Sequence, residues 1–191
     1  METKNIMIVG VGGQGTLLTS RILGGLAISA GYDVKLSEVH GMAQRGGSVV
    51  TYVRYGDKVN EPIVEEGQAD VLIAFEQLEA QRYAHFLKAN GVIIVNEQKI
   101  IPMPVVIGVA KYPDHIIEEL EKIYRVYRVD AGKEAKNIGN SRVFNVIVLG
   151  IAAQHMDFSE EEWLTVIGNT VPAKTVEINK KAFEVGYNLH K

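Results

Sequence analysis

The chain of 191 residues contains no cysteine. This absence excludes disulfides, thiolate nucleophiles and cysteine-ligated iron–sulfur clusters within the chain. It also fits a reducing compartment, and we expect a cytoplasmic protein. The first residues lead straight into a strand-like run, without the pattern of a signal peptide.

An excess of charge of one sign is also lacking. Lys and Arg number 20 and Asp and Glu number 23, and the cations are scattered along the chain. Such a chain lacks the clustered basic residues that bind the phosphates of a nucleic acid. Long apolar runs are missing too, because the longest, residues 143–153, is shorter than the ~20 residues of a membrane-spanning helix. We therefore expect neither a nucleic acid nor a membrane as partner.

Familiar catalytic motifs are absent. No His, Asp or Glu group has metal-ligand spacing, and there is no Gly-x-Ser-x-Gly elbow and no Walker loop. No pair of carboxylates stands out for acid–base catalysis. We therefore expect no metal site and no certain catalytic residue.

The chain does have short apolar runs that alternate with amphipathic segments. Strands are predicted at 6–9, 34–36, 48–55, 71–75, 92–96, 105–109 and 124–129, and helices at 16–30, 76–89, 113–123, 141–156, 159 onward and 174–187. Alternation of this kind is typical of α/β proteins with a mainly parallel or mixed sheet flanked by helices. We predict a single α/β domain over residues 1–191, with five or more strands, a Rossmann-like start and a helical C-terminal third.

A first glycine-rich loop follows the first predicted strand. It reads Gly10-Val11-Gly12-Gly13-Gln14-Gly15 and fits the pattern G-x-G-x-x-G. Bare backbone there would let a pyrophosphate approach the N–H groups that open the helix. Glu38, at the end of the second strand, stands where an acid would hold a ribose. The alternatives are a tight structural turn or a loop that faces a partner, which the amide of Gln14 would also suit.

A second loop joins the next two strands. It reads Glu38-Val39-His40-Gly41-Met42-Ala43-Gln44-Arg45-Gly46-Gly47. Arg45 offers a planar fork for carboxylate or phosphate, or it pairs with Glu38. His40 could transfer protons or be a structural histidine, while Gly46 and Gly47 would let another chain approach the backbone. We expect both loops at the carboxyl edge of the sheet, where ligands and partners bind.

A third polar group opens the long apolar helix. Asn140, Arg142 and Asn145 lie close in sequence, and the last two share a helix face. Asn145 is interpreted either as a buried amide that satisfies backbone groups or as a functional residue.

Taken together, the two loops resemble the gamma-type domain of the 2-oxoacid–ferredoxin oxidoreductases. The His-Gly-Met-Ala-Gln-Arg-Gly-Gly form is most similar to that of beta subunits in the indolepyruvate branch of the family. Supporting matches are Glu65-x-Gly67-x-Ala69-Asp70, Glu76-x-Leu78-Glu79-Ala80, Gly139-Asn140-x-Arg142-x-x-Asn145 and Lys181-Ala182-Phe183-x-x-Gly186-Tyr187. The similarity spans residues 4–187.

The resemblance implies a complex that converts a 2-oxoacid and coenzyme A into acyl-coenzyme A, carbon dioxide and reduced ferredoxin. Thiamine diphosphate and [4Fe-4S] clusters would belong to a large alpha subunit, and this chain would bind no cofactor alone. It would then be the small non-redox subunit of an enzyme for indolepyruvate or another aryl pyruvate. Its glycine-rich loops would face the large subunit or coenzyme A, and ferredoxin would be reached through the complex.

Two other functions are compatible with the residues. A free-standing NAD(P)- or FAD-dependent oxidoreductase would rest on Gly10, Gly12, Gly15 and Glu38. A nucleotide-binding regulatory module would use the same loop without catalysis.

Overall fold

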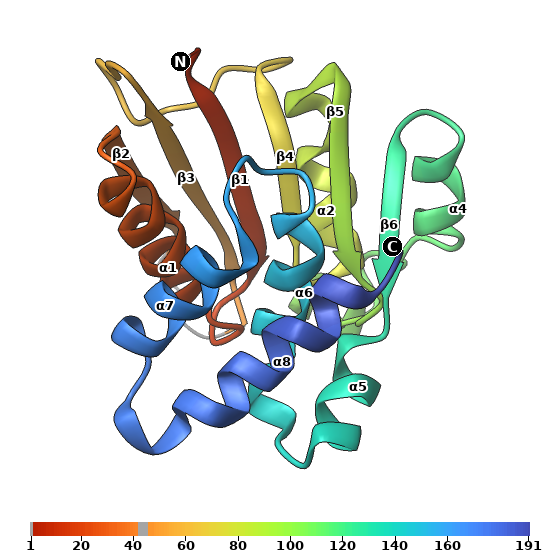
Figure 1. Cartoon of the computed structure of the whole chain (residues 1–191). Helices are drawn as coiled ribbons and strands as arrows, with labels where there is room; N and C mark the ends of the chain where they lie inside the picture. Colours follow the sequence, from red (N-terminus) through yellow and green to blue (C-terminus); the bar gives the residue numbers. More distant parts are fainter. Residues whose placement is uncertain (1, 42–45) are drawn as a thin grey trace.

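The computed structural model describes residues 2–41 and 46–191. Its central element is a six-stranded sheet with the order β2-β3-β1-β4-β5-β6 (Figure 1). The strands are β1 (Lys4–Val11), β2 (Asp33–His40), β3 (Ser48–Gly56), β4 (Ala69–Ala74), β5 (Leu87–Asn96) and β6 (Arg125–Val129). The predicted α/β class with five or more strands is confirmed.

One strand gives the sheet its mixed character. β1, β4, β5 and β6 pair in parallel, whereas β3 is antiparallel to both β1 and β2. β2 therefore runs in the same direction as β1 but is separated from it by β3. The predicted Rossmann-like start is confirmed in its order along the chain, which is β1, the glycine-rich loop, α1 and then β2. The two strands β1 and β2 are parallel but are not neighbours in the sheet.

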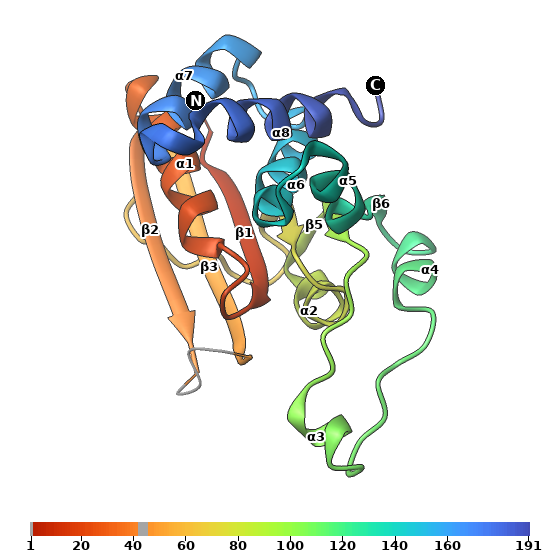
Figure 2. The ribbon, with the colours of Figure 1, turned by 90° about the horizontal axis from the view of Figure 1, so that it is seen from below.

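Helices cover both faces of the sheet (Figure 2). They are α1 (Thr16–Ser29), α2 (Gln77–Tyr83), α3 (Met103–Val106), α4 (Ile116–Glu121), α5 (Ala131–Ile138), α6 (Phe144–Ala153), α7 (Glu160–Thr170) and α8 (Val176–Asn188), with the 3-10 turns η1 (Ala84–Phe86), η2 (Ser141–Val143) and η3 (Ala173–Thr175). One apolar core lies under α1, α6, α7 and α8, and the other lies under α2 and α4. The helical C-terminal third is confirmed.

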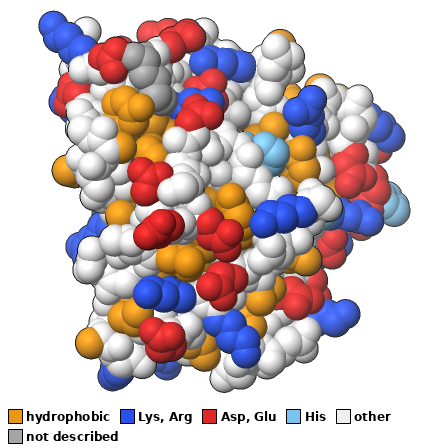
Figure 3. Space-filling view, in the orientation of Figure 1, with side chains coloured by type: hydrophobic (Ala, Val, Ile, Leu, Met, Phe, Trp, Pro, Cys, Tyr) orange, Lys and Arg blue, Asp and Glu red, His pale blue; other side chains and the backbone are white. Residues whose placement is uncertain are grey.

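The outer surface over α8 carries mixed charges. On the side seen in Figure 3, apolar side chains form small groups separated by acidic and basic ones. Within the described ranges, no helix combines the length and the apolarity that a bilayer crossing requires. The apolar run at 143–153 is instead a core helix, since nearly every residue of α6 is buried.

Two predicted elements differ from the structure. Residues 105–109 were expected as a strand, but Met103–Val106 form α3, because Pro102 and Pro104 suit a first helical turn. The helix predicted to reach residue 89 ends earlier, since Leu87 already pairs with Ala69 of β4. Strand pairing overrides the helix propensity of the local sequence there.

The helix ends largely follow their sequence signals. Ser159 opens α7 and forms a capping box with Glu162. Asp130 caps α5 by accepting a hydrogen bond from the Lys133 amide. Gly31 follows α1 with φ +84°, the left-handed conformation that favours glycine.

Helices α6 and α8 cross with their backbones in direct contact. A Cβ added at Gly186 would lie 1.9 Å from the carbonyl oxygen of Ile147, and one added at Gly150 would lie 2.3 Å from that of Phe183. Two glycines therefore set how closely the C-terminal helix packs on the core helix.

We predict that Gly186→Ala lowers the free energy of unfolding by about 1–3 kcal/mol or more, because the added methyl group forces the two helices apart. Gly168→Ala is the matched control, since its Cβ would make ordinary contacts, 3.4 Å from the flexible end of Lys180 and 3.7 Å from Val176 Cγ1. Thermal and urea denaturation measure both variants. Equal stability of the two variants would contradict the close crossing.

Candidate functional site

The two glycine-rich loops lie together at one edge of the sheet. β1, β2, β4 and β5 all end there, and β3 begins there at Ser48. The Gly12 amide donates a 2.9 Å hydrogen bond to the Gly47 carbonyl oxygen. The first loop is thus bonded directly to the end of the second, at the carboxyl edge that the sequence predicted.

A hollow of about 380 Å³ opens between the first loop and the end of β2. Its lining comprises Gly12, Gly13, Gly15, Thr16, Leu17, Glu38, His40 and Val49. The Glu38 carboxylate accepts hydrogen bonds from the hydroxyls of Thr16, at 3.3 Å, and Thr51, at 3.1 Å. An anion of the chain itself therefore lies beside the first turn of α1, where a pyrophosphate would be repelled.

The side chain of Gln14 is part of the internal structure of the first loop. Its Oε1 accepts from the Val11 amide at 2.6 Å, and its Nε2 donates to the Phe75 carbonyl oxygen and to Gln98 Oε1, both at 3.0 Å. The residue is only 7% exposed. The amide of Gln14 is therefore already engaged within the chain, and its contact with a ligand or partner stays a prediction.

Asn145 also supports the loop from within. It is buried, its Oδ1 accepts from the Val146 amide, and its Nδ2 lies 3.5 Å from the Gly15 carbonyl oxygen. Gly15 has φ +88°, and a Cβ there would lie 2.3 Å from Asn145 Nδ2. The interpretation of Asn145 as a buried structural amide agrees with these contacts, and a role for Asn145 in binding a partner stays a prediction. Gly15 is required for the turn.

The other members of this polar group have different surroundings. Asn140 accepts a hydrogen bond from the Arg142 amide and so begins the turn η2. The Arg142 side chain is exposed. Of the three predicted residues, Arg142 is exposed, Asn140 is half-buried and Asn145 is buried.

Only part of the second loop can be described. His40 and Gly41 are exposed, and the ring Nδ1 of His40 donates a 3.1 Å hydrogen bond to the Gly41 carbonyl oxygen. Gly46 has φ +79°. The predicted contact residues Gln44 and Arg45 lie outside the described residues.

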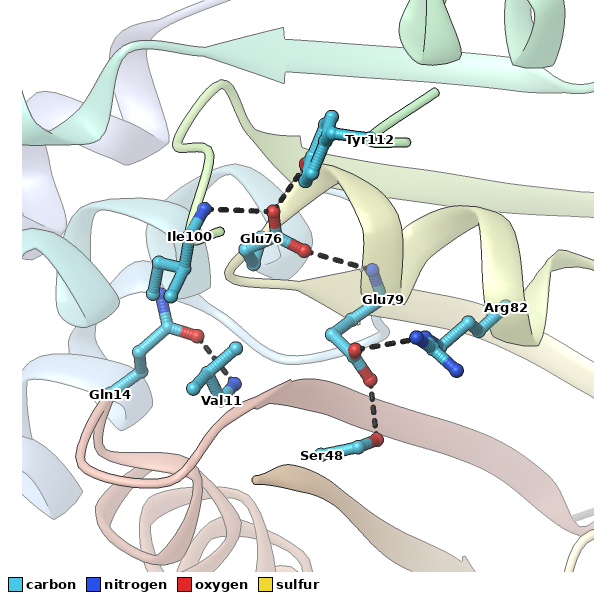
Figure 4. A network of polar contacts seen from close by, with 8 residues as sticks. All are labelled: Val11, Gln14, Ser48, Glu76, Glu79, Arg82, Ile100 and Tyr112. Atoms are coloured by element: carbon cyan, nitrogen blue, oxygen red, sulfur yellow. Dashed lines mark hydrogen bonds and ion pairs between the residues drawn. The ribbon is translucent and has the colours of Figure 1, made fainter. Parts of the chain in front are cut away.

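A buried carboxylate that the sequence did not single out lies beside the loops. Glu76 follows β4 and is 1% exposed. Its Oε2 accepts from the Glu79 amide at 3.0 Å, and its Oε1 accepts from the Ile100 amide, at 3.1 Å, and the Tyr112 hydroxyl (Figure 4). Three donors stabilise the charge where water is excluded. Burial, and next the bond to Glu76, raise the pKa of Tyr112, so its hydroxyl stays a donor.

Glu79 links the second loop to α2. Its Oε2 accepts from the Ser48 hydroxyl, and its Oε1 pairs with Arg82 Nε at 3.1 Å (Figure 4). Burial raises the pKa of the Glu79 carboxyl, and the neighbouring Glu76 adds to the rise, although the Ser48 bond and Arg82 oppose it. Since Ser48 directly follows Gly47, this carboxyl positions the end of the glycine loop.

A second hollow, of about 240 Å³, lies over this pair of carboxylates. It is lined by Val11, Gly46, Gly47, Ser48, Glu76, Leu78, Glu79, Arg82, Ile100, Pro102, Met103 and Pro104. The sequence analysis singled out no pair of carboxylates for acid–base catalysis, and the structure brings together Glu76 and Glu79, both of which are bonded within the chain. The sequence carries a signal for this pair, because Glu76 follows a buried strand and Glu79 stands three residues later at the start of a helix. In residues 2–41 and 46–191 there is no group of three or more His, Asp or Glu side chains able to hold a metal ion.

We predict that Gln14→Ala lowers the free energy of unfolding by about 1–3 kcal/mol, because the Val11 amide and the Phe75 carbonyl oxygen lose a buried partner. Urea denaturation of the isolated chain measures this change. An unchanged midpoint would contradict the structural role and restore Gln14 as a surface contact.

We predict that Glu79→Gln changes how stability depends on pH. The raised pKa means that the folded protein binds this proton more tightly than the unfolded chain. The stabilisation is complete below the ordinary carboxyl value of 4.5 and is lost as the pH rises through the higher folded value. The free energy of unfolding of Glu79→Gln, relative to the wild type, should therefore rise with pH.

The control for this measurement is Glu162→Gln. Hydrogen bonds from Ser159 lower the pKa of Glu162, so its contribution is present at high pH and lost on acidification. Denaturation curves between pH 4 and 8 should give opposite slopes for the two variants. Parallel slopes would disprove the assignment for Glu79.

Comparison with known proteins gives relatives over the full length. The chain is 48% identical over 189 residues to the "Indolepyruvate oxidoreductase subunit IorB" of Archaeoglobus fulgidus, covering 96% of this chain and 94% of the relative. It is 43% identical over 199 residues to the protein of the same name from Thermococcus kodakarensis, covering 100% and 98%.

The fold has a counterpart among solved structures. The keto/oxoacid ferredoxin oxidoreductase gamma subunit of Geobacter sulfurreducens superposes with a TM-score of 0.70 at 26% identity, covering 96% of each chain. The family model described as pyruvate ferredoxin/flavodoxin oxidoreductase matches residues 5–189. Since that match takes in the sheet, both glycine-rich loops and the C-terminal helices, this chain belongs to the pyruvate ferredoxin/flavodoxin oxidoreductase family.

Proposed function

We propose that this chain is the small, non-redox subunit of a 2-oxoacid–ferredoxin oxidoreductase and acts with a large catalytic subunit. The observation that carries the proposal is the full-length identity, at 43% and 48%, to proteins named as indolepyruvate oxidoreductase subunits. By that likeness, the substrate is indolepyruvate or a related aryl pyruvate. The complex would form acyl-coenzyme A and carbon dioxide and pass electrons to ferredoxin.

The chemistry of the site supports a structural contribution to this reaction. Gln14, Glu76, Glu79 and Asn145 are all engaged in hydrogen bonds within the chain. Besides Glu38 and His40, the described part of this edge presents mainly backbone and small residues. A surface of this kind suits close approach of another polypeptide.

The cofactors of the complex do not fit the residues of this chain. A [4Fe-4S] cluster requires thiolate ligands, and the sequence contains no cysteine. The diphosphate of thiamine diphosphate or coenzyme A would meet the Glu38 carboxylate at the start of α1. We therefore assign thiamine diphosphate and the clusters to the large subunit, and any contact with coenzyme A to surfaces completed by that subunit.

The partner-facing residues are those of the two loops that remain accessible. We propose that Gly12, Gly13, His40, Gly41, Gln44, Arg45, Gly46, Gly47 and, farther along, Arg142 face the large subunit. The continuous sheet supports treating residues 1–191 as one functional domain, and the lack of cysteine fits a cytoplasmic enzyme.

The test is co-expression of this chain with a large subunit of an indolepyruvate oxidoreductase. We expect a stable complex that reduces ferredoxin with indolepyruvate and coenzyme A, and loss of most of that activity when the small chain is omitted. Anaerobic assays and light scattering give both readouts. Full activity of the large subunit alone, together with no complex, would refute the proposal.

The same preparation tests the rival assignment. A free-standing dinucleotide enzyme would bind NAD, NADP or FAD in calorimetry on the isolated chain. We expect no such binding, because Glu38 is bonded to Thr16 and Thr51 and because β3 separates β2 from β1. Binding tighter than about 10 µM, equivalent to roughly 7 kcal/mol, would favour the rival.

A further inference from the structure

An apolar segment projects from the opposite side of the molecule to α8 (Figure 2). Residues 101–110 read Ile-Pro-Met-Pro-Val-Val-Ile-Gly-Val-Ala, ten positions without a charged or hydrogen-bonding side chain. Met103 is 68% exposed, Ile107 64% and Val109 73%, and Ile101 and Val106 are exposed as well. Contiguous exposed apolar surface of this kind marks an interaction site. We call residues 100–112 the apolar arm.

Hydrogen bonds hold the two ends of the apolar arm against the rest of the domain. Glu76 Oε1 accepts from the Ile100 amide at one end of the arm and from the Tyr112 hydroxyl at the other. Lys99 Nζ also lies 5.9 Å from the centre of the Tyr112 ring. One buried carboxylate thus joins the outgoing and returning segments, as Figure 4 shows.

The tip of the arm has its own backbone order. The amides of Val105 and Val106 donate to the Pro102 carbonyl oxygen, and those of Val109 and Ala110 donate to the Pro104 carbonyl oxygen. Two prolines further restrict the chain. The arm therefore presents its apolar side chains in a preformed shape, which reduces the entropy lost on binding.

We propose that the apolar arm inserts into an apolar groove of the large catalytic subunit and is the main anchor of the complex. This inference rests on the proposed function and assigns its interface. The second hollow supports it, because Pro102, Met103 and Pro104 share that lining with Gly46 and Gly47. The arm is thus continuous with the loop that faces the partner.

The charges around the arm favour a different chain over a second copy of this one. Lys99 and Lys111 bracket the apolar run, and both are exposed. A two-fold contact through the arms would bring four like charges to one small interface. A groove with acidic residues at its rim, on another subunit, complements the same surface.

The test compares two equally exposed isoleucines. Ile107→Glu places a charge on the arm, whereas Ile28→Glu places one on α1, and both residues are 64% exposed in the wild type. We expect Ile107→Glu to weaken binding to the large subunit at least about 30-fold, the size of an interface hot spot. Ile28→Glu should bind as the wild type does, and both variants should keep the wild-type melting temperature.

The outcomes separate the two proposals. Failure of the wild-type chain to bind the large subunit would overturn the proposed function and this inference together. Wild-type binding that Ile107→Glu leaves intact would overturn the inference alone. A wild-type dimer that Ile107→Glu converts to a monomer, with binding of the large subunit unchanged, would assign the arm to a second copy. If Ile107→Glu lowers the melting temperature, the same binding measurements are made on Val109→Glu, since Val109 is 73% exposed, and the same outcomes apply.

Discussion

A single buried carboxylate connects the parts of this structure that bear on function. Glu76 lies at the end of β4 and bonds the start of α2, the beginning of the apolar arm and its end. An ionised group this deeply buried is tolerated only when several donors surround it. The hydrogen bonds of this one side chain therefore bring both ends of the arm, 24 and 36 residues away in sequence, to the start of α2 at the carboxyl edge. Glu79 extends the same network through Ser48 to the second glycine-rich loop.

The buried polar groups that the structure describes at this edge hold the chain together. Gln14 bridges β1, β4 and the segment after β5, and Asn145 reaches from α6 to the first loop. The exposed surface of this edge, within the described residues, includes glycine backbone, the side chains of Glu38 and His40, and the apolar arm. That division suits a family member whose part in electron transfer is to bind and shape a neighbouring subunit.

Much of the fold could be predicted because its signals are local. Buried strands such as β1 and β4 are short apolar runs, and the caps of α5 and α7 are set by Asp130 and Ser159. The wrong predictions concern segments whose secondary structure depends on pairing with a strand far away in the sequence. Residues 105–109 are apolar enough for a strand but have no neighbouring strand to pair with, and Leu87 leaves its helical surroundings to pair with Ala69. The position of β3 between β1 and β2 has no local signal.

The sequence by itself determined the family, the two glycine-rich loops and the impossibility of a thiolate-bound cluster, since each of these depends on residue types and short spacings. Only the tertiary structure decided which side chains are free to act. Gln14 finds its partners 61 and 84 residues away, and Asn145 lies beside a glycine 130 residues away. The residue type determines which hydrogen bonds a side chain can make. Whether those bonds are already formed within the chain depends on which donors and acceptors the fold places within about 3 Å of each atom.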